Sequence, residues 1–298
     1  MRNPFFRAAG SSGRTFGAAG VLPAVGALAV AMLLPASSLG APTVRELRPG
    51  LASGAPLEVP GRAPLARFRP APLANASSLR VANSFDSETR TNGKILAVSP
   101  GEGVYSCSGT AIDTPSRSVV LTAGHCVIEG HRVGRRMVFV PAYDHGRRPF
   151  GTFRVKSVYV MPQWRRSENP DFDLAALRVA PSPQGRLVDM VGGRGYVTSK
   201  SRLFRFQIFG YPAAALRGEE LRSCRAHGLG ADPLTNPFIG PPTLPASCDM
   251  AAGASGGGWL YEGKYVNGVT SYSYAGRPTK LHSPYFGPAI ASFLRQLP

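Results

Sequence analysis

Short apolar segments separated by turn residues fill the chain from about residue 94 to its C-terminus. Each of these segments is bounded by Gly, Pro, Asn or Asp, which is typical of short β-strands. The pattern predicts strands at residues 95–98, 118–122, 137–140, 152–160, 174–179, 204–209 and 265–272. Helical spacing of apolar positions occurs at the end, after Pro288, at Ile290, Phe293, Leu294 and Leu297. Many short strands with one terminal helix predict an all-β barrel or sandwich.

The first forty residues have the three-part layout of a secretory signal peptide. Arginines precede an apolar run from Val21 to Leu34, and small residues follow it. This run is shorter than the roughly 20 residues of a membrane-spanning helix, so we interpret residues 1–40 as a signal peptide and not as an anchor. No adjacent arginines precede the run, which favours the general secretion route and a secreted, extracellular protein.

A change in composition separates residues 41–90 from the rest of the chain. Prolines are frequent up to about residue 82, and Phe68 is the one aromatic residue of that stretch. Such a segment offers little to pack. We therefore predict a pro-segment or linker at 41–90 and a folded domain at 91–298.

The chain is strongly basic, with 34 Lys and Arg residues against 17 Asp and Glu residues and a formal net charge of +17. Such a charge favours contact with polyanions. However, the arginine clusters are not accompanied by a helix-turn-helix, RNA-binding or zinc-finger motif. We expect a solvated basic surface that associates with an anionic cell envelope, and no nucleic-acid binding.

The four cysteines are Cys107, Cys126, Cys224 and Cys248. An even number suits an oxidising compartment, and three pairings are open. None of them lies in a C-x-x-C arrangement, which argues against a zinc site.

Three motifs carry residue types that acyl-transfer chemistry needs. His125 lies in the turn T-A-G-H-C, Asp173 begins the run D-L-A-A-L, and Ser255 lies in the turn G-A-S-G-G. A serine hydroxyl becomes a nucleophile when a neutral imidazole takes its proton and a carboxylate fixes the imidazole tautomer. The glycines would let the amides of Gly253 and Ser255 form an oxyanion hole. Each motif alone is commonly structural, but their combination in this order indicates a catalytic triad.

These motifs resemble those of the chymotrypsin-like (trypsin-fold) serine proteases, and the finer pattern is similar to the secreted bacterial, glutamyl-endopeptidase-like branch. That pattern consists of the segments 107–110, 161–164, 210–212, 248–250 and 268–271. The resemblance spans roughly residues 94–298. It implies two antiparallel six-stranded β-barrels packed together, with the site in the cleft between them.

The resemblance also implies a role for each motif residue: His125 as general base, Asp173 as orienting acid and Ser255 as nucleophile. Asp173 is preferred to Asp171 because D-L-A-A-L matches the family pattern, although both would point to one face of a strand. On this reading the expected disulfides are Cys107–Cys126 and Cys224–Cys248.

The residues around Ser255 bear on substrate preference. Asp249 lies six residues before it. In the trypsin family this offset places a carboxylate at the base of the primary pocket, where it selects Arg or Lys side chains of the substrate. Alternatively, Asp249 only anchors a turn. The strand after the serine, in which we assign Ser271 to substrate binding, contains no histidine, which disfavours acidic-residue specificity. Ala254 stands where animal trypsins carry the aspartate that captures a freed N-terminal amine, so that activation switch is not expected.

The sequence therefore predicts a secreted serine endopeptidase that acts on polypeptides as a monomer, without metal or cofactor. One alternative is a catalytically silent homologue that serves as a binding module, and another is an esterase with the same triad. An α/β-hydrolase is excluded, although the serine turn also satisfies G-x-S-x-G. After Ser255 the only acid is Glu262 and the only histidine is His282, and no helical crossovers are visible.

Overall fold

The computed structural model describes residues 46–47, 78–99, 103–213, 217–235, 240–250, 252–274, 277 and 279–298. All of them belong to one compact unit, residues 40–298. The predicted signal peptide lies outside the described residues. Among the helices that are described, none is long and apolar enough to cross a bilayer.

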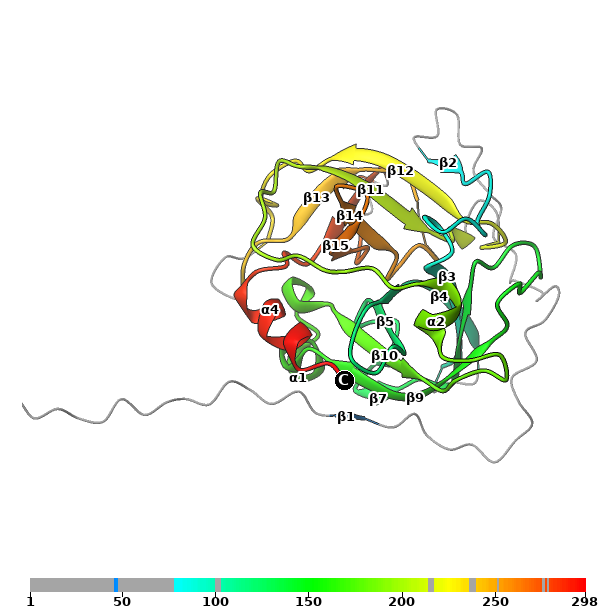
Figure 1. The fold of residues 1–298 in the computed structure, drawn as a ribbon. Helices are drawn as coiled ribbons and strands as arrows, with labels where there is room; N and C mark the ends of the chain where they lie inside the picture. Colours follow the sequence, from blue (N-terminus) through cyan, green and yellow to red (C-terminus); the bar gives the residue numbers. More distant parts are fainter. Residues whose placement is uncertain are drawn as a thin grey trace, which may run out of the picture. The chain divides into compact units, whose positions relative to one another are not determined.

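A closed barrel of six strands forms the first half of this unit (Figure 1). Its strands are β3 (Asn92–Val98), β4 (Val104–Ile112), β5 (Val119–Thr122), β8 (Arg135–Pro141), β9 (Phe153–Val160) and β10 (Ala175–Val179). Hydrogen bonding runs in the order β9-β10-β5-β4-β3-β8, and the β8–β9 pairing closes the ring. Fully buried side chains such as Ile95, Phe139 and Leu177 fill its interior.

A second ring of strands follows in the C-terminal half. It contains β11 (Arg205–Gly210), β12 (Arg222–His227), β13 (Leu244–Ser247), β14 (Gly258–Tyr261), β15 (Tyr265–Val269) and β16 (Lys280–Ser283). The strands β15-β14-β11-β12 pair continuously, and β13 pairs with β16. Isolated β-bridges join the β13–β16 pair to the four-stranded sheet: Gly228 pairs with Ala246, and Tyr272 pairs with His282. The interior is built around Trp259, so the predicted two-barrel, all-β architecture is present.

The apolar pattern located only part of these strands. It missed β4, β12, β13, β14 and β16, whose residues include many Ser, Arg, Gly or Pro. Polar residues can lie inside a barrel when they are hydrogen-bonded: Thr110 of β4, fully buried, donates its hydroxyl to Asn92 Oδ1 at 2.9 Å. The short elements between strands were also not predicted: β6 (Ile128–Glu129), β7 (Arg132–Val133), α1 (Pro162–Ser167), η1 (Pro170–Phe172) and α2 (Leu187–Val191).

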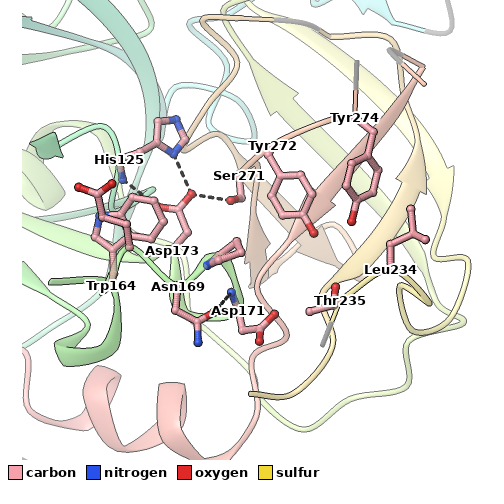
Figure 2. Close-up of a pocket in the computed structure, with 12 residues that line it drawn as sticks. His125, Trp164, Asn169, Asp171, Asp173, Leu234, Thr235, Ser271, Tyr272 and Tyr274 are labelled. Carbon is pink, nitrogen blue, oxygen red and sulfur yellow. Dashed lines mark hydrogen bonds and ion pairs between the residues drawn. The ribbon is translucent and has the colours of Figure 1, made fainter. Parts of the chain in front are cut away.

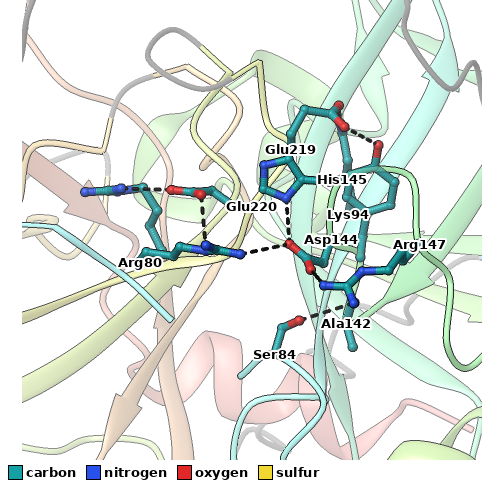
Figure 3. A network of polar contacts seen from close by, with 11 residues as sticks. Arg80, Ser84, Lys94, Ala142, Asp144, His145, Arg147, Glu219 and Glu220 are labelled. Carbon is teal, nitrogen blue, oxygen red and sulfur yellow. Dashed lines mark hydrogen bonds and ion pairs between the residues drawn. The ribbon is translucent and has the colours of Figure 1, made fainter. Parts of the chain in front are cut away.

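The folded domain begins before the predicted boundary at residue 91. Strand β2 (Leu79–Arg80) pairs with β12, and β1 (Glu46–Leu47) pairs with β9. Figure 3 shows Arg80 between two carboxylates, with Nε 3.3 Å from Glu220 Oε2 and Nη2 3.6 Å from Asp144 Oδ1. Because Asp144 follows a strand of the first barrel and Glu220 precedes one of the second, the segment that we assigned to a linker contacts both halves.

Helix α4 (Pro288–Arg295) forms where the apolar spacing predicted it. Its buried residues Ile290, Phe293 and Leu294 belong to the same core cluster as the first barrel, although they follow the last strand of the second. The helix therefore returns the chain to the first half of the molecule (Figure 1).

Because Phe293 is buried in this cluster, we expect Phe293→Ala to lower the free energy of unfolding by about 3–5 kcal/mol, the typical effect of removing a core aromatic ring. Urea unfolding followed by circular dichroism measures this change. The matched control is Arg295→Ala, an exposed position of the same helix, which should stay within about 0.5 kcal/mol of wild type. Equal stabilities of the two variants would contradict the packing of α4.

Candidate active site

His125 and Asp173 form a close pair at the open end of the first barrel. The small-residue turn after β5 brings the His125 backbone N–H to 2.8 Å from Asp173 Oδ1 and its ring Nδ1 to 2.7 Å from Oδ2 (Figure 2). The Asp173 side chain is 2% exposed, whereas the His125 side chain is 34% exposed. Gly124 permits this approach, because a Cβ there would lie 2.9 Å from Asp173 Oδ1. One buried carboxylate thus fixes both the backbone and the ring of the histidine.

Ser271, from the second barrel, donates its hydroxyl to the same Asp173 oxygen as the ring. We assigned Ser271 to substrate binding. Its side chain is a third donor to Asp173, and the residue also lines the neighbouring cavity. Sequence reasoning did not identify this contact, since it joins residues 98 positions apart.

Asp171 lies apart from the histidine. Our expectation that both aspartates point to one face of a strand is wrong, because residues 170–172 form the 3-10 turn η1 and β10 begins only at Ala175. Asn169 caps this turn by accepting the Asp171 N–H at 3.0 Å. Asp173 lies at the C-terminal end of the turn, and the two carboxylates therefore diverge.

The serine turn is held against the first barrel by Ser108 of β4. Its N–H donates to Ser255 O at 2.7 Å, and its hydroxyl donates to Gly253 O at 2.8 Å. Gly256 lies so close to the end of β5 that a Cβ would come within 2.0 Å of Thr122 Oγ1. Since Thr122 begins the turn that carries His125, the half-exposed Ser255 is held beside that turn. The motif around Ser108 resembles the family pattern but does not by itself indicate this role.

Two backbone N–H groups of this turn are free of protein acceptors. Within the described part of the chain, the amides of Gly253 and Ser255 donate to no backbone or side-chain group. Gly253 has a φ of +95°, and a Cβ there would lie 2.6 Å from Tyr211 O. Only glycine fits this conformation, which leaves two donors available to a ligand oxygen.

Both expected disulfides, Cys107–Cys126 and Cys224–Cys248, are present. The first joins the residue before Ser108 to the residue after His125, so it braces the site. Among the described residues, two groups of three side chains have potential metal-ligand atoms close enough together to hold an ion. Each group includes one disulfide pair. Their sulfurs are bonded to each other and are not thiolate ligands.

Asp249 contacts the segment that precedes β2. It is half-buried, and its Oδ1 accepts the N–H of the buried Ser78 at 3.0 Å. It is not among the residues around the cavity beside His125.

That cavity has a volume of about 590 Å³ and was not foreseen from the sequence. Figure 2 shows it extending from His125 past Ser271 to two tyrosines. Its walls are formed by His125, Trp164, Glu168, Asn169, Pro170, Asp171, Asp173, Leu234, Thr235, Ser271, Tyr272 and Tyr274. The repeated S-Y-S-Y after Thr270 was the one local signal of an aromatic wall.

Comparisons with known proteins agree on one family. The family model described as Trypsin matches residues 86–290. The protease Anisep from Arthrobacter nicotinovorans is 32% identical, with a TM-score of 0.65 over 72% of this chain and 96% of that one. The thermostable serine protease AL20 from an extremophilic microorganism is 28% identical, with a TM-score of 0.63 over 70% and 96%. A Glu endopeptidase at 19% identity shares the fold, with a TM-score of 0.60 over 74% and 96%.

One curated protein, the extracellular metalloprotease of Bacillus subtilis (strain 168), is 29% identical over 98 residues. The match covers 33% of this chain and 29% of that protein. The chain thus spans less than a third of the curated relative, and this match carries no argument about the whole protein.

The protonation of His125 depends on its environment. Burial of the ring favours the neutral form, but the negative charge of Asp173 and the hydrogen bond to it favour the imidazolium more strongly. The net effect raises the pKa of His125 above its usual value of 6.5. The ring therefore takes up a proton as pH falls through that raised pKa.

We expect an NMR titration of the five histidines to show the His125 pKa above 6.5. In Asp173→Asn it should be lower than in wild type, because the charge that favours the imidazolium is gone. His125→Gln assigns the resonance, and the exposed His131 serves as the internal control. An unchanged His125 pKa in Asp173→Asn would contradict the pairing.

Proposed function

The chain belongs to the trypsin family of serine proteases, and we propose that it hydrolyses peptide bonds with Ser255 as nucleophile, His125 as general base and Asp173 as orienting acid. The observation that carries the proposal is the doubly held His125–Asp173 pair, next to a turn that presents a half-exposed serine. This arrangement supports a triad of the three residue types that acyl transfer requires.

In the proposed reaction, Ser255 Oγ forms a bond to the scissile carbonyl carbon while His125 Nε2 takes the hydroxyl proton. Asp173 keeps the other ring proton on Nδ1, so Nε2 is free to act as the base. The carbonyl oxygen becomes negative and accepts from the free amides of Gly253 and Ser255. The C–N bond then breaks, and His125 returns the proton to the leaving amine. Water releases the acyl group by the same steps in reverse.

Export is part of the proposal. The layout of residues 1–40 supports a signal peptide, and the two disulfides suit an oxidising compartment. A secreted monomer acting on polypeptides, with its basic surface held to an anionic envelope, is consistent with these features.

A fluorophosphonate probe should label the purified wild-type chain and should not label Ser255→Ala, as intact-mass analysis would show. Asp173→Asn should label more slowly, since the tautomer of His125 is no longer fixed, and should lower kcat for peptides by about 10⁴-fold. A wild-type chain that stays unlabelled, with its N-terminal segment removed, would favour the silent homologue. Labelling with hydrolysis of a simple ester but of no peptide would favour the esterase.

We further propose that Asp249 favours Arg or Lys before the scissile bond. It lies six residues before Ser255, and a half-buried carboxylate at that position can pair with a guanidinium. In a peptide-library digest, Asp249→Ser should lower kcat/KM for these substrates at least about 30-fold, the effect of losing roughly 2 kcal/mol from one charged pair.

The matched control is Asp113→Ser, which removes an exposed carboxylate paired with Arg117. Cleavage after Glu, or an unchanged Arg preference in Asp249→Ser, would contradict the assignment.

A further inference from the structure

The cavity beside His125 differs in charge from the rest of the molecule. The chain has twice as many basic as acidic residues, 34 against 17. The cavity walls nevertheless include the carboxylates of Glu168, Asp171 and Asp173 and no Lys or Arg among the described residues. In a basic protein, an acidic cavity is a local feature that can attract a cation.

Asp171 is the carboxylate of this cavity that lacks a full set of partners. The residue is 1% exposed, and its Oδ1 has no hydrogen-bond partner among the described residues. Asp173, in contrast, receives donors from both His125 and Ser271. Figure 2 shows the Asp171 carboxylate turned away from His125, toward the side of the cavity that Thr235 lines. A buried oxygen without a donor is destabilising unless a ligand supplies one.

A second buried carboxylate, Asp232, lies behind the same wall. It is 3% exposed, and its Oδ2 accepts the hydroxyls of Tyr274 at 2.6 Å and of Tyr272 and Thr235 at 3.1 Å. These hydroxyls are therefore directed to Asp232, while the tyrosine residues themselves line the cavity. Aromatic ring faces attract cations.

The charged groups around Asp171 compensate its negative charge only in part. Burial and the nearby charge of Asp232 raise its pKa to about 6, and Arg202 opposes this rise. The Arg202 guanidinium is otherwise engaged: it donates to the carbonyls of Pro242 and Thr243 and stacks 3.8 Å over the ring of Tyr285. It forms no ion pair with Asp171 among the described residues.

We propose that this cavity is a substrate subsite that binds a lysine or arginine side chain, with Asp171 as its anionic anchor and Tyr272 and Tyr274 as its aromatic wall. The guanidinium or ammonium group supplies the missing donor to Asp171 Oδ1. The inference rests on the proposed protease function, and it concerns a substrate residue other than the one that provides the scissile carbonyl. The preference for a cationic side chain in this cavity is therefore separate from the preference for Arg or Lys before the scissile bond that we attribute to Asp249.

The test uses internally quenched peptides in which each position in turn carries arginine or its neutral isostere citrulline. At pH 8, wild type should show at least about a tenfold higher kcat/KM for arginine at one position besides the one before the scissile bond. Asp171→Asn should bring the ratio of kcat/KM for the arginine peptide to kcat/KM for the citrulline peptide near one. Asp113→Asn, which removes an exposed carboxylate, should keep the wild-type ratio.

The same ratio should fall in wild type as pH drops below about 6, where Asp171 becomes neutral. Protonation of His125 affects both substrates alike and cancels in the ratio. Equal cleavage of both peptides by wild type, or an unchanged ratio in Asp171→Asn, would overturn the subsite.

The thermal stability of Asp171→Asn distinguishes a substrate anchor from a purely structural residue. A carboxyl whose pKa is raised in the folded state destabilises the fold once pH exceeds its unfolded value of 3.8. Asp171→Asn should therefore raise the Tm at pH 8, and the gain should vanish near pH 4. A lower Tm together with equal losses for both peptides would identify a structural residue and overturn the proposal.

Direct binding separates the subsite from catalysis. Trp164, one of two tryptophans, lines the cavity, so its fluorescence reports binding of the arginine and citrulline peptides to Ser255→Ala. One outcome is that wild type cleaves no peptide, whereas Ser255→Ala binds the arginine peptide more tightly than the citrulline peptide and loses this preference when Asp171→Asn is added. In that case the protease assignment fails and the subsite stands. No difference between the two peptides would overturn the subsite.

Discussion

The buried carboxylate of Asp173 is the point on which the two halves of the molecule depend. A charge taken out of water is tolerated only when donors surround it, and here the donors come from both barrels. His125 supplies its backbone and ring N–H groups from the first barrel, and Ser271 supplies its hydroxyl from the second. The same hydrogen bonds therefore dock the barrels and fix the imidazole.

Ser108 forms a second connection across the same junction. It holds the carbonyls of Gly253 and Ser255 through its N–H and hydroxyl, and its hydroxyl oxygen accepts the N–H of Tyr211 at 2.9 Å. Gly256 makes this possible, because a side chain there would overlap Thr122 and Ser108 of the first barrel. While Ser108 holds these carbonyls, the amides of Gly253 and Ser255 have no acceptor in the described part of the chain.

Asp171 and Asp173 have different environments although one residue separates them. The 3-10 turn directs the Asp173 carboxylate to several donors, whereas Asp171 Oδ1 has no hydrogen-bond partner among the residues that the structure describes. The acidic cavity that results lies in a protein of net charge +17. Such a contrast concentrates the attraction for cations at the site, while the exterior as a whole favours anions.

The sequence alone predicted the features that are local. The histidine and serine motifs, the strongest apolar strands, the terminal helix and, through the family resemblance, both disulfides could be identified from short stretches of residues. Strand β4 was missed because its buried residues Ser108 and Thr110 are polar and hydrogen-bonded. Strand β12 was missed because its buried residues, Cys224 and Ala226, are small and give a weak apolar pattern. The roles of Ser108 and Ser271, the divergence of Asp171 from Asp173 and the acidic cavity were decided by the tertiary structure. Each arises where segments distant along the chain pack together, as Ser271 and Asp173 do across 98 residues, and local residue patterns carry no information about such contacts.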